Sequence, residues 1–171
     1  MLTTQRLLLR PMKDEDAYNL YQLNSDPDVV RYTGDSGCIN LTDAQKIITD
    51  LSKPQFQKYK MGRFAVLLTD GTLAGWCGLK FHPEISEVDL GYRFHKRFWG
   101  QGFATEASRA TLQYGFGDLG LQLITARAMP ANVASIKVLQ KLGMTFRGLV
   151  TESCEPRGFL KYDLSLTEFN K

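Results

Sequence analysis

The spacing of hydrophobic positions changes along the chain, and this predicts a domain that mixes strands and helices. Apolar runs of strand length cover residues 6–12, 63–82 (two strands), 87–95 and 122–130, and the chain closes on "TFRGLV" and "FLKYDLSL". Helical spacing covers residues 13–27, 41–60, 103–114 and 132–144. The predicted order is strand, two helices, three strands, helix, strand, helix, two strands. This order indicates an α/β domain built on one mixed sheet.

Turn and cap residues divide these elements. Asp70 and Gly71 predict a tight turn inside 63–82, and Pro54 predicts an interruption of the helix over 41–60. Asn132 can cap the start of the last helix, and Gly143 can end it. No repeat or Pro/Gly/Ser-rich linker divides the sequence, so we expect one domain over residues 1–171.

Composition and charge narrow the class of protein. The 171 residues carry a net charge of +3, and the basic residues form no long stripe, so we expect no nucleic-acid partner. No run approaches the roughly 20 apolar residues of a membrane helix, which predicts a cytoplasmic protein without a membrane partner. Cys38, Cys77 and Cys154 lack metal-ligand spacing, so we expect buried or idle thiols and no metal.

The stretch "WGQGFA", Trp99 to Ala104, carries the first functional signal. A strand precedes it and a helix follows it, so the first free N–H groups of the helix can bind an anion. Glycine permits close contact between a ligand and the backbone, and the basic run His95–Arg97 adds local attraction. A plain turn is the alternative interpretation. The N–H groups proposed for the anion belong to Gly100, Gln101, Gly102, Phe103 and Ala104.

Two common phosphate-binding motifs do not fit this stretch. A P-loop requires Lys and Ser/Thr after its second glycine, where this chain has Phe103 and Ala104. A dinucleotide-binding motif requires a third small residue and an acidic residue about 20 positions later. Thr105 stands where that motif has its third glycine, and residues 122–134 contain no Asp or Glu.

The chain resembles the GNAT N-acetyltransferase superfamily over nearly its whole length. "WGQGFA" matches the coenzyme A signature of the family, with Gly102 and Ala104 in its two small positions. Trp99 stands where Gln or Arg is usual, and the run "LGYRFHKRFWGQGFATEA" is similar to the branch that acetylates ribosomal-protein N-termini. "NVASIKVLQKLGM" resembles the second family block, at the expected separation.

The resemblance implies acetyl-coenzyme A as acetyl donor. Its pyrophosphate would rest on the amides of residues 100–105, and Lys96 and Arg97 would meet the remaining phosphate charge. Its pantetheine arm would lie between strands 87–95 and 122–130, bonded to the backbone of Phe94, whose N–H could also support the oxyanion. The implied cofactor-binding residues are Phe94, Lys96, Arg97, Trp99, Gly100, Gln101, Gly102, Phe103, Ala104, Thr105, Asn132 and Ser135.

The resemblance also implies direct attack of an amine on the thioester through a tetrahedral intermediate. Ser135 is the candidate donor to the leaving thiolate, and helix capping is its alternative role. The position where many relatives place a tyrosine is Leu139. The candidate bases are Glu87 and Asp89, which share one strand face; either could instead be a solvated carboxylate. Glu84 and Glu152 are further options.

The acceptor is expected to be a primary amine, on a small molecule or at a protein N-terminus. Tyr32 opens a polar loop over residues 32–42 and is the candidate substrate-binding side chain, with packing as its alternative role. A homodimer is among the expected assemblies. Two other classes stay open from sequence: a non-catalytic acyl-coenzyme A sensor or partner-binding module, and, less favoured, a nucleic-acid-binding domain.

Overall fold

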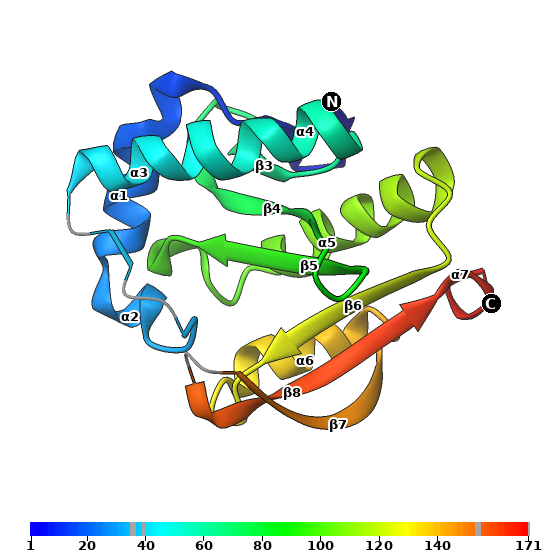
Figure 1. Ribbon diagram of the computed structural model, residues 1–171. Helices are drawn as coiled ribbons and strands as arrows, with labels where there is room; N and C mark the ends of the chain where they lie inside the picture. Colours follow the sequence, from blue (N-terminus) through cyan, green and yellow to red (C-terminus); the bar gives the residue numbers. More distant parts are fainter. Residues whose placement is uncertain (35–36, 39, 153–154, 171) are drawn as a thin grey trace.

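A computed structural model describes residues 1–34, 37, 38, 40–152 and 155–170, and within them eight strands form one sheet (Figure 1). The spatial order is β1 (Leu2–Thr3), β2 (Leu7–Pro11), β3 (Arg63–Leu68), β4 (Leu73–His82), β5 (Glu87–Phe94), β6 (Leu123–Ala128), β8 (Glu155–Ser165) and β7 (Thr145–Glu152). The β5–β6 pair is parallel and the other neighbouring pairs are antiparallel. The predicted mixed α/β class is confirmed.

Helices flank this sheet. They are η1 (Asp14–Asp16), α1 (Ala17–Ser25), α2 (Pro27–Val30), α3 (Leu41–Lys46), η2 (Ile47–Ser52), α4 (Lys53–Tyr59), η3 (Lys96–Phe98), α5 (Phe103–Gln113), η4 (Tyr114–Asp118), α6 (Val133–Lys141) and α7 (Leu166–Phe169). The predicted caps of α6 are confirmed: Asn132 Oδ1 accepts the Ser135 N–H at 3.1 Å, and Gly143 has φ +80°.

Two hydrophobic cores form because successive strand residues face opposite sides of the sheet. On one side, Phe64 and Leu79 belong to the core that includes residues of α5 and α6. On the other side, Ala65 and Trp76 belong to the core of α1, α3 and η2. The predicted buried thiols follow this division: Cys77 is buried in the first core and Cys38 in the second, whereas Cys154 lies outside the described residues.

The interruption expected near Pro54 takes the form of a π-helical segment, η2, and the helical path does not break. The Lys53 N–H bonds to the Ile48 carbonyl oxygen, five residues earlier. Pro54 has no N–H to continue the α-helical ladder, so it stands in the first turn of α4, where that N–H is not needed.

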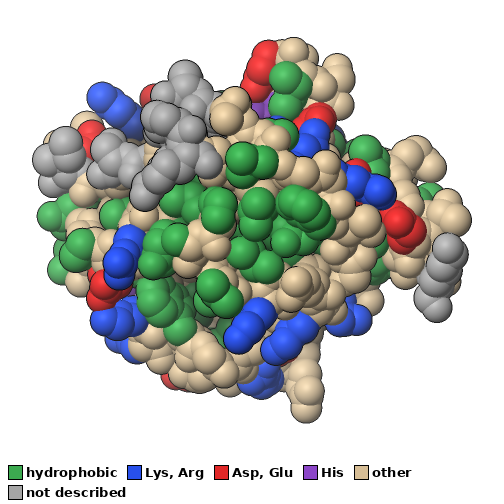
Figure 2. Space-filling view, turned by 90° about the horizontal axis from the view of Figure 1, so that it is seen from below, with side chains coloured by type: hydrophobic (Ala, Val, Ile, Leu, Met, Phe, Trp, Pro, Cys, Tyr) green, Lys and Arg blue, Asp and Glu red, His purple; other side chains and the backbone are tan. Residues whose placement is uncertain are grey.

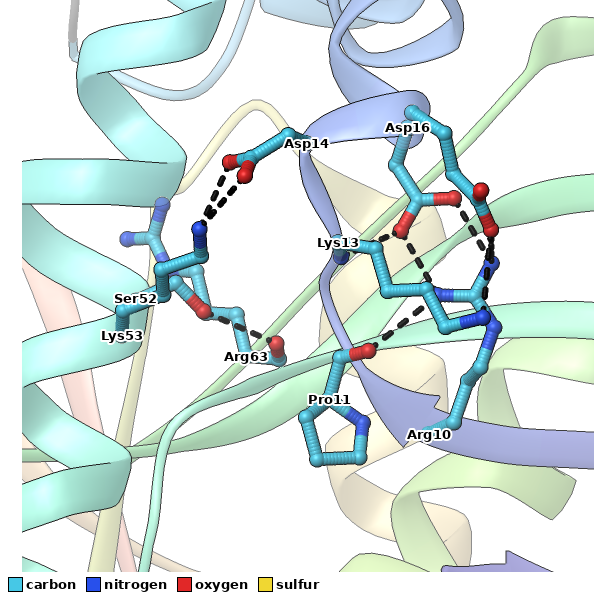
Figure 3. Close-up of polar contacts among 9 residues, drawn as sticks. Arg10, Pro11, Lys13, Asp14, Asp16, Ser52, Lys53 and Arg63 are labelled. Carbon is cyan, nitrogen blue, oxygen red and sulfur yellow. Dashed lines mark hydrogen bonds and ion pairs between the residues drawn. The ribbon is translucent and has the colours of Figure 1, made fainter.

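A network of ion pairs ties the first helices to the sheet (Figure 3). Arg10 on β2 donates from two nitrogens to the buried Asp16 of η1, at 2.7 and 2.8 Å. Lys53 at the start of α4 binds Asp14 at 2.7 Å. These contacts fix the start of α1 and the start of α4 relative to β2.

The end of the molecule formed by α6, β7 and β8 carries exposed apolar side chains. Figure 2 shows hydrophobic side chains in the middle of this view from below, with Lys and Arg mainly around them. Val133 on α6 and Phe146 and Leu149 on β7 are each more than half exposed. In the described sheet β7 is the outermost strand, so its outer edge is not paired with another strand.

Candidate active site

The sheet splits between β5 and β6. These parallel strands share one residue pair, Asp89 with Thr125, whereas β4 and β5 pair along all eight residues of β5. Beyond that point β5 continues through Tyr92 to Phe94 without a paired residue on β6. The split leaves a strand edge inside the sheet.

The backbone of β5 presents hydrogen-bonding groups to this split. The His95 N–H bonds to the Ala74 carbonyl oxygen at 3.0 Å, so by antiparallel alternation the N–H groups of Phe94 and Tyr92 point toward β6. The Phe94 carbonyl oxygen accepts a 2.8 Å bond from the indole N–H of Trp99. An extended ligand can therefore bond to β5 as an added strand would.

The predicted glycine loop stands at the mouth of the split. Gly100 and Gly102 have φ values of +74° and +82°, a region that favours glycine, and Gly102 is the N-cap of α5. The first backbone bond of α5 runs from the Glu106 N–H to the Gly102 oxygen at 3.0 Å. The N–H groups of residues 103–105 precede that bond, so they remain available to an anion.

Arg6 holds this loop from outside and was missed by the sequence analysis. Its guanidinium donates to the Gln101 carbonyl oxygen at 3.0 Å and to Glu106 at 2.7 Å, and it lies 4.5 Å from the centre of the Phe103 ring. Thr4 adds a 2.7 Å bond to Glu106. Arg6 and Glu106 are 100 residues apart, so no local pattern could have joined them.

A cavity of about 470 Å³ connects the loop, the end of β5 and the start of α6. The predicted site residues that line it are Tyr32, Phe94, Lys96, Trp99, Gly100, Gly102, Phe103, Ala104, Thr105, Asn132 and Ser135. Arg97 and Gln101 are not among the lining residues. The Gln101 side chain turns back to the Arg97 carbonyl oxygen at 2.9 Å, and the Arg97 guanidinium lies over Phe98.

The lining is rich in positive charge. Its basic side chains are Arg31, Arg93, Lys96, Lys137 and Lys141. Among the described lining residues Asp28 is the single acid, and it is bound to Lys96 at 2.5 Å. An excess of cations around a cavity attracts an anionic ligand. Lys96 would therefore be shared between Asp28 and a bound phosphate.

Ser135 lies on the first turn of α6 with its hydroxyl next to a tyrosine. The Asn132 cap holds the Ser135 N–H, and the Ser135 hydroxyl lies 2.7 Å from the hydroxyl of Tyr92 on β5. Burial raises the pKa of Tyr92 well above its usual range. The local sequence pattern does not distinguish Tyr92 from the other aromatic residues of a strand, so its contact with Ser135 was not expected.

The two candidate bases differ in their surroundings. Lys161 and Arg127 bind Glu87, the latter at 3.1 Å, and the Lys161 hydrogen bond is the main cause of a lowered pKa at Glu87. Burial raises the pKa of Asp89 to about 6, and this effect outweighs the lowering by nearby cations, chiefly Arg127. The Oδ1 atom of Asp89 has no hydrogen-bond partner among the described residues. A base needs a pKa near working pH, which favours Asp89.

Alternation along β5 puts Tyr92, the hydrogen-bond partner of Ser135, and the candidate base Asp89 on opposite faces of the strand. Tyr92 belongs to the face that packs in the first core, together with Leu90. Asp89 belongs to the opposite face with Arg93, whose guanidinium lies 5.6 Å from the centre of the Trp76 ring in the second core. Asp89 also pairs with Thr125 where the sheet splits, and neither Asp89 nor Glu87 lines the cavity.

Three further residues were expected to take part, Glu84 and Glu152 as bases and Tyr32 as a substrate contact. Glu84 is exposed and lies 3.1 Å from His82. The Glu152 side chain is outside the described part of the structure. Tyr32 lines the cavity, and the Arg31 guanidinium lies 5.3 Å from the centre of its ring.

The split strand edge and the glycine loop together define a site for a long phosphorylated ligand. The family described as acetyltransferase (GNAT) domain matches residues 6–145, and the chain belongs to this family. The chain is thus an acetyl-coenzyme A-dependent N-acetyltransferase. The residues present fit this co-substrate, since free amides at the start of α5 would suit a pyrophosphate and the unpaired edge of β5 would suit an amide-containing arm.

Similar proteins support this conclusion. The uncharacterized N-acetyltransferase p20 of Bacillus licheniformis is 32% identical over 161 residues, 93% of this chain and 90% of the relative. A GNAT-family acetyltransferase structure from Bacillus anthracis aligns with TM-score 0.83 at 25% identity over 98% of this chain and 99% of that one. Mycobacterium smegmatis RimJ in complex with CoA-disulfide has the same fold: TM-score 0.83, 22% identity, 96% and 84% coverage.

In the described part of the chain, no group of three or more His, Cys, Asp and Glu side chains is arranged to hold a metal ion. Among the helices that the structure describes, none has the length and apolar character to cross a membrane.

Proposed function

We propose that this protein moves the acetyl group of acetyl-coenzyme A to a primary amine by direct attack. The observation that carries the proposal is the sheet split, with backbone N–H groups of β5 on one side and the glycine loop at its mouth. A thioester bound along β5 would lie between the Ser135 hydroxyl and the Asp89 face of the strand. No covalent enzyme intermediate is then required.

The proposal gives each site residue a role that its position supports. The amides of residues 100–105 hold the pyrophosphate. Asn132 fixes the start of α6, and Trp99 fixes the end of β5. The Phe94 N–H supports the arm or the oxyanion, Asp89 takes the amine proton, and Ser135 donates to the leaving sulfur. Glu87 is proposed to position Arg127 and Lys161, because both cations bind it.

The acceptor is proposed to carry a single amine, either on a small molecule or at a protein N-terminus. Burial raises the pKa of Asp89, and the nearby positive charges of Arg127, Arg63 and Lys80 offset part of that rise. This cationic surround disfavours a polyamine, whose additional ammonium groups would be repelled. Tyr32 is the proposed contact for such an acceptor from the cavity side.

A turnover assay tests the proposal. Purified protein with acetyl-coenzyme A is given a panel of N-terminal peptides, monoamines and polyamines, each beside its N-acetylated counterpart as the matched control. We expect thiol release and a mass increase only with free monoamine or peptide acceptors. Release that does not depend on the amine, or turnover with polyamines alone, contradicts the proposal.

A homodimer remains a proposal for the assembly. Phe146 and Leu149 support it, because they are exposed on the outermost strand β7. Light scattering on wild-type protein and on the Phe146→Ser, Leu149→Ser variant tests it. A dimer that the substitutions dissociate supports this surface, and a monomeric wild type refutes the proposal.

A further inference from the structure

The hydroxyl of Tyr92 meets Ser135 at two places. Its oxygen lies 2.7 Å from Ser135 Oγ and 3.3 Å from the Ser135 carbonyl oxygen. Both residues line the cavity that contains the glycine loop. The contact joins β5 to the first turn of α6 across 43 residues of sequence.

Either hydroxyl can donate in the 2.7 Å contact, and the inference below takes the direction in which Tyr92 donates to Ser135 Oγ. In the described structure both partners of the Tyr92 hydroxyl are on Ser135. Burial raises the pKa of the Tyr92 phenol, which favours its protonated form at neutral pH. Ser135 has one hydroxyl proton of its own, and its N–H is already bound by Asn132.

A role in packing alone does not account for this arrangement. A phenylalanine at position 92 would fill the same space beside Cys77, the residue of β4 that pairs with it. The hydroxyl adds a short contact to a serine that reaches the cavity from the first turn of α6. When Tyr92 donates to Ser135 Oγ, the Ser135 proton is directed to another acceptor, and donation polarises that O–H group.

We infer that Tyr92 is a positioning residue that orients the Ser135 hydroxyl toward the sulfur of the bound thioester. The inference rests on the proposed function of Ser135 as donor. The amine nitrogen forms a bond to the carbonyl carbon and gives its proton to Asp89. The C–S bond breaks, its electron pair stays on sulfur, and the Ser135 O–H bonds to that thiolate while Tyr92 remains neutral.

The experiment compares Tyr92→Phe, Ser135→Ala and the double variant with wild type. Tyr114→Phe is the matched control, because its hydroxyl donates to the Lys60 carbonyl oxygen outside the cavity. The assay measures kcat and KM for acetyl-coenzyme A, and calorimetry measures the Kd of coenzyme A. Melting temperatures report folding of each variant.

We expect Tyr92→Phe to lower kcat about five-fold, the effect of one hydrogen bond, with KM and Kd within about two-fold of wild type. Ser135→Ala lowers kcat more, and adding Tyr92→Phe to it causes no further loss. Tyr114→Phe leaves kcat unchanged. Fluorotyrosine at position 92, which keeps the hydroxyl, retains wild-type kcat.

Other outcomes overturn the inference. These are an unchanged kcat in Tyr92→Phe, losses that add in the double variant, or a defect confined to KM and Kd. If wild type shows no turnover with any amine, the proposed function has failed instead. In that case a crystal complex with coenzyme A decides: sulfur beside Ser135 Oγ with Tyr92 behind it supports the inference, and sulfur elsewhere refutes it.

Discussion

Replacing Asp89 with asparagine should make the protein more stable and less active. Asp89 Oδ1 is buried without a partner in the described structure, and the pKa of this carboxyl is raised from 3.8 to about 6. A base that is kept ionised at neutral pH in such a place destabilises the folded state. Asparagine has nearly the same shape and carries no charge.

The magnitude follows from the raised pKa of Asp89. The shift from 3.8 to about 6 is about 2 units, and each unit corresponds to about 1.4 kcal/mol, so ionisation costs about 3 kcal/mol at pH 8. Since the pKa is higher in the folded state, the folded protein binds the proton more tightly. Wild type therefore gains stability as the pH falls from about 6 to about 4, where the cost has disappeared. The amide of the introduced asparagine needs desolvation too, so we expect the variant to recover about 1–3 kcal/mol at pH 8.

Urea unfolding at pH 4 and pH 8, together with kcat/KM against pH, measures both effects. We expect Asp89→Asn to be more stable at pH 8 and equal to wild type at pH 4. Wild-type kcat/KM should fall below a pH of about 6, and the variant should lose about 100-fold at pH 8. Equal stability at pH 8, a stability difference that does not change with pH, or a variant with normal turnover refutes the reasoning.

Three further substitutions have expected outcomes. Gly102→Glu should abolish coenzyme A binding in calorimetry, because residue 102 has φ +82° and the new charge would meet the pyrophosphate; Gly117→Glu, in open space, should bind normally. Asp16→Ala should lower the free energy of unfolding by about 3 kcal/mol or more in urea, because it removes the main partner of the largely buried Arg10 guanidinium; a loss under about 1 kcal/mol contradicts this. Glu87→Gln should reduce kcat by a factor at least ~10 times smaller than the factor for Asp89→Asn. Equal reductions would show that both carboxylates take part in proton transfer.

The sequence predicts the parts of the site that are local in the chain. The turn at Gly100 and Gly102, the cap at Asn132 and the alternation of β5 each depend on neighbouring residues. The order of strands and helices is also predictable, because the spacing of hydrophobic positions within each segment distinguishes a strand from a helix. An interruption is predicted near Pro54, whereas the helical path continues there as a π-helical segment, which depends on a hydrogen bond that composition does not reveal.

The parts that were missed depend on tertiary register. Arg6 meets Glu106 across 100 residues, and Tyr92 meets Ser135 only because β5 and α6 both border the cavity. The choice between Glu87 and Asp89 likewise required the position of Lys161 on β8, which binds Glu87 and leaves Asp89 as the candidate with a raised pKa. Each of these contacts joins segments that are far apart in the sequence, so no local spacing of residues predicts it.

A crystal structure of the protein grown with coenzyme A tests the central claim most directly. We expect phosphate oxygens within hydrogen-bond distance of the N–H groups of residues 100–105, and the pantetheine arm bonded to Phe94 in the split between β5 and β6. Coenzyme A bound elsewhere, or a split closed by pairing of β5 with β6, would contradict it.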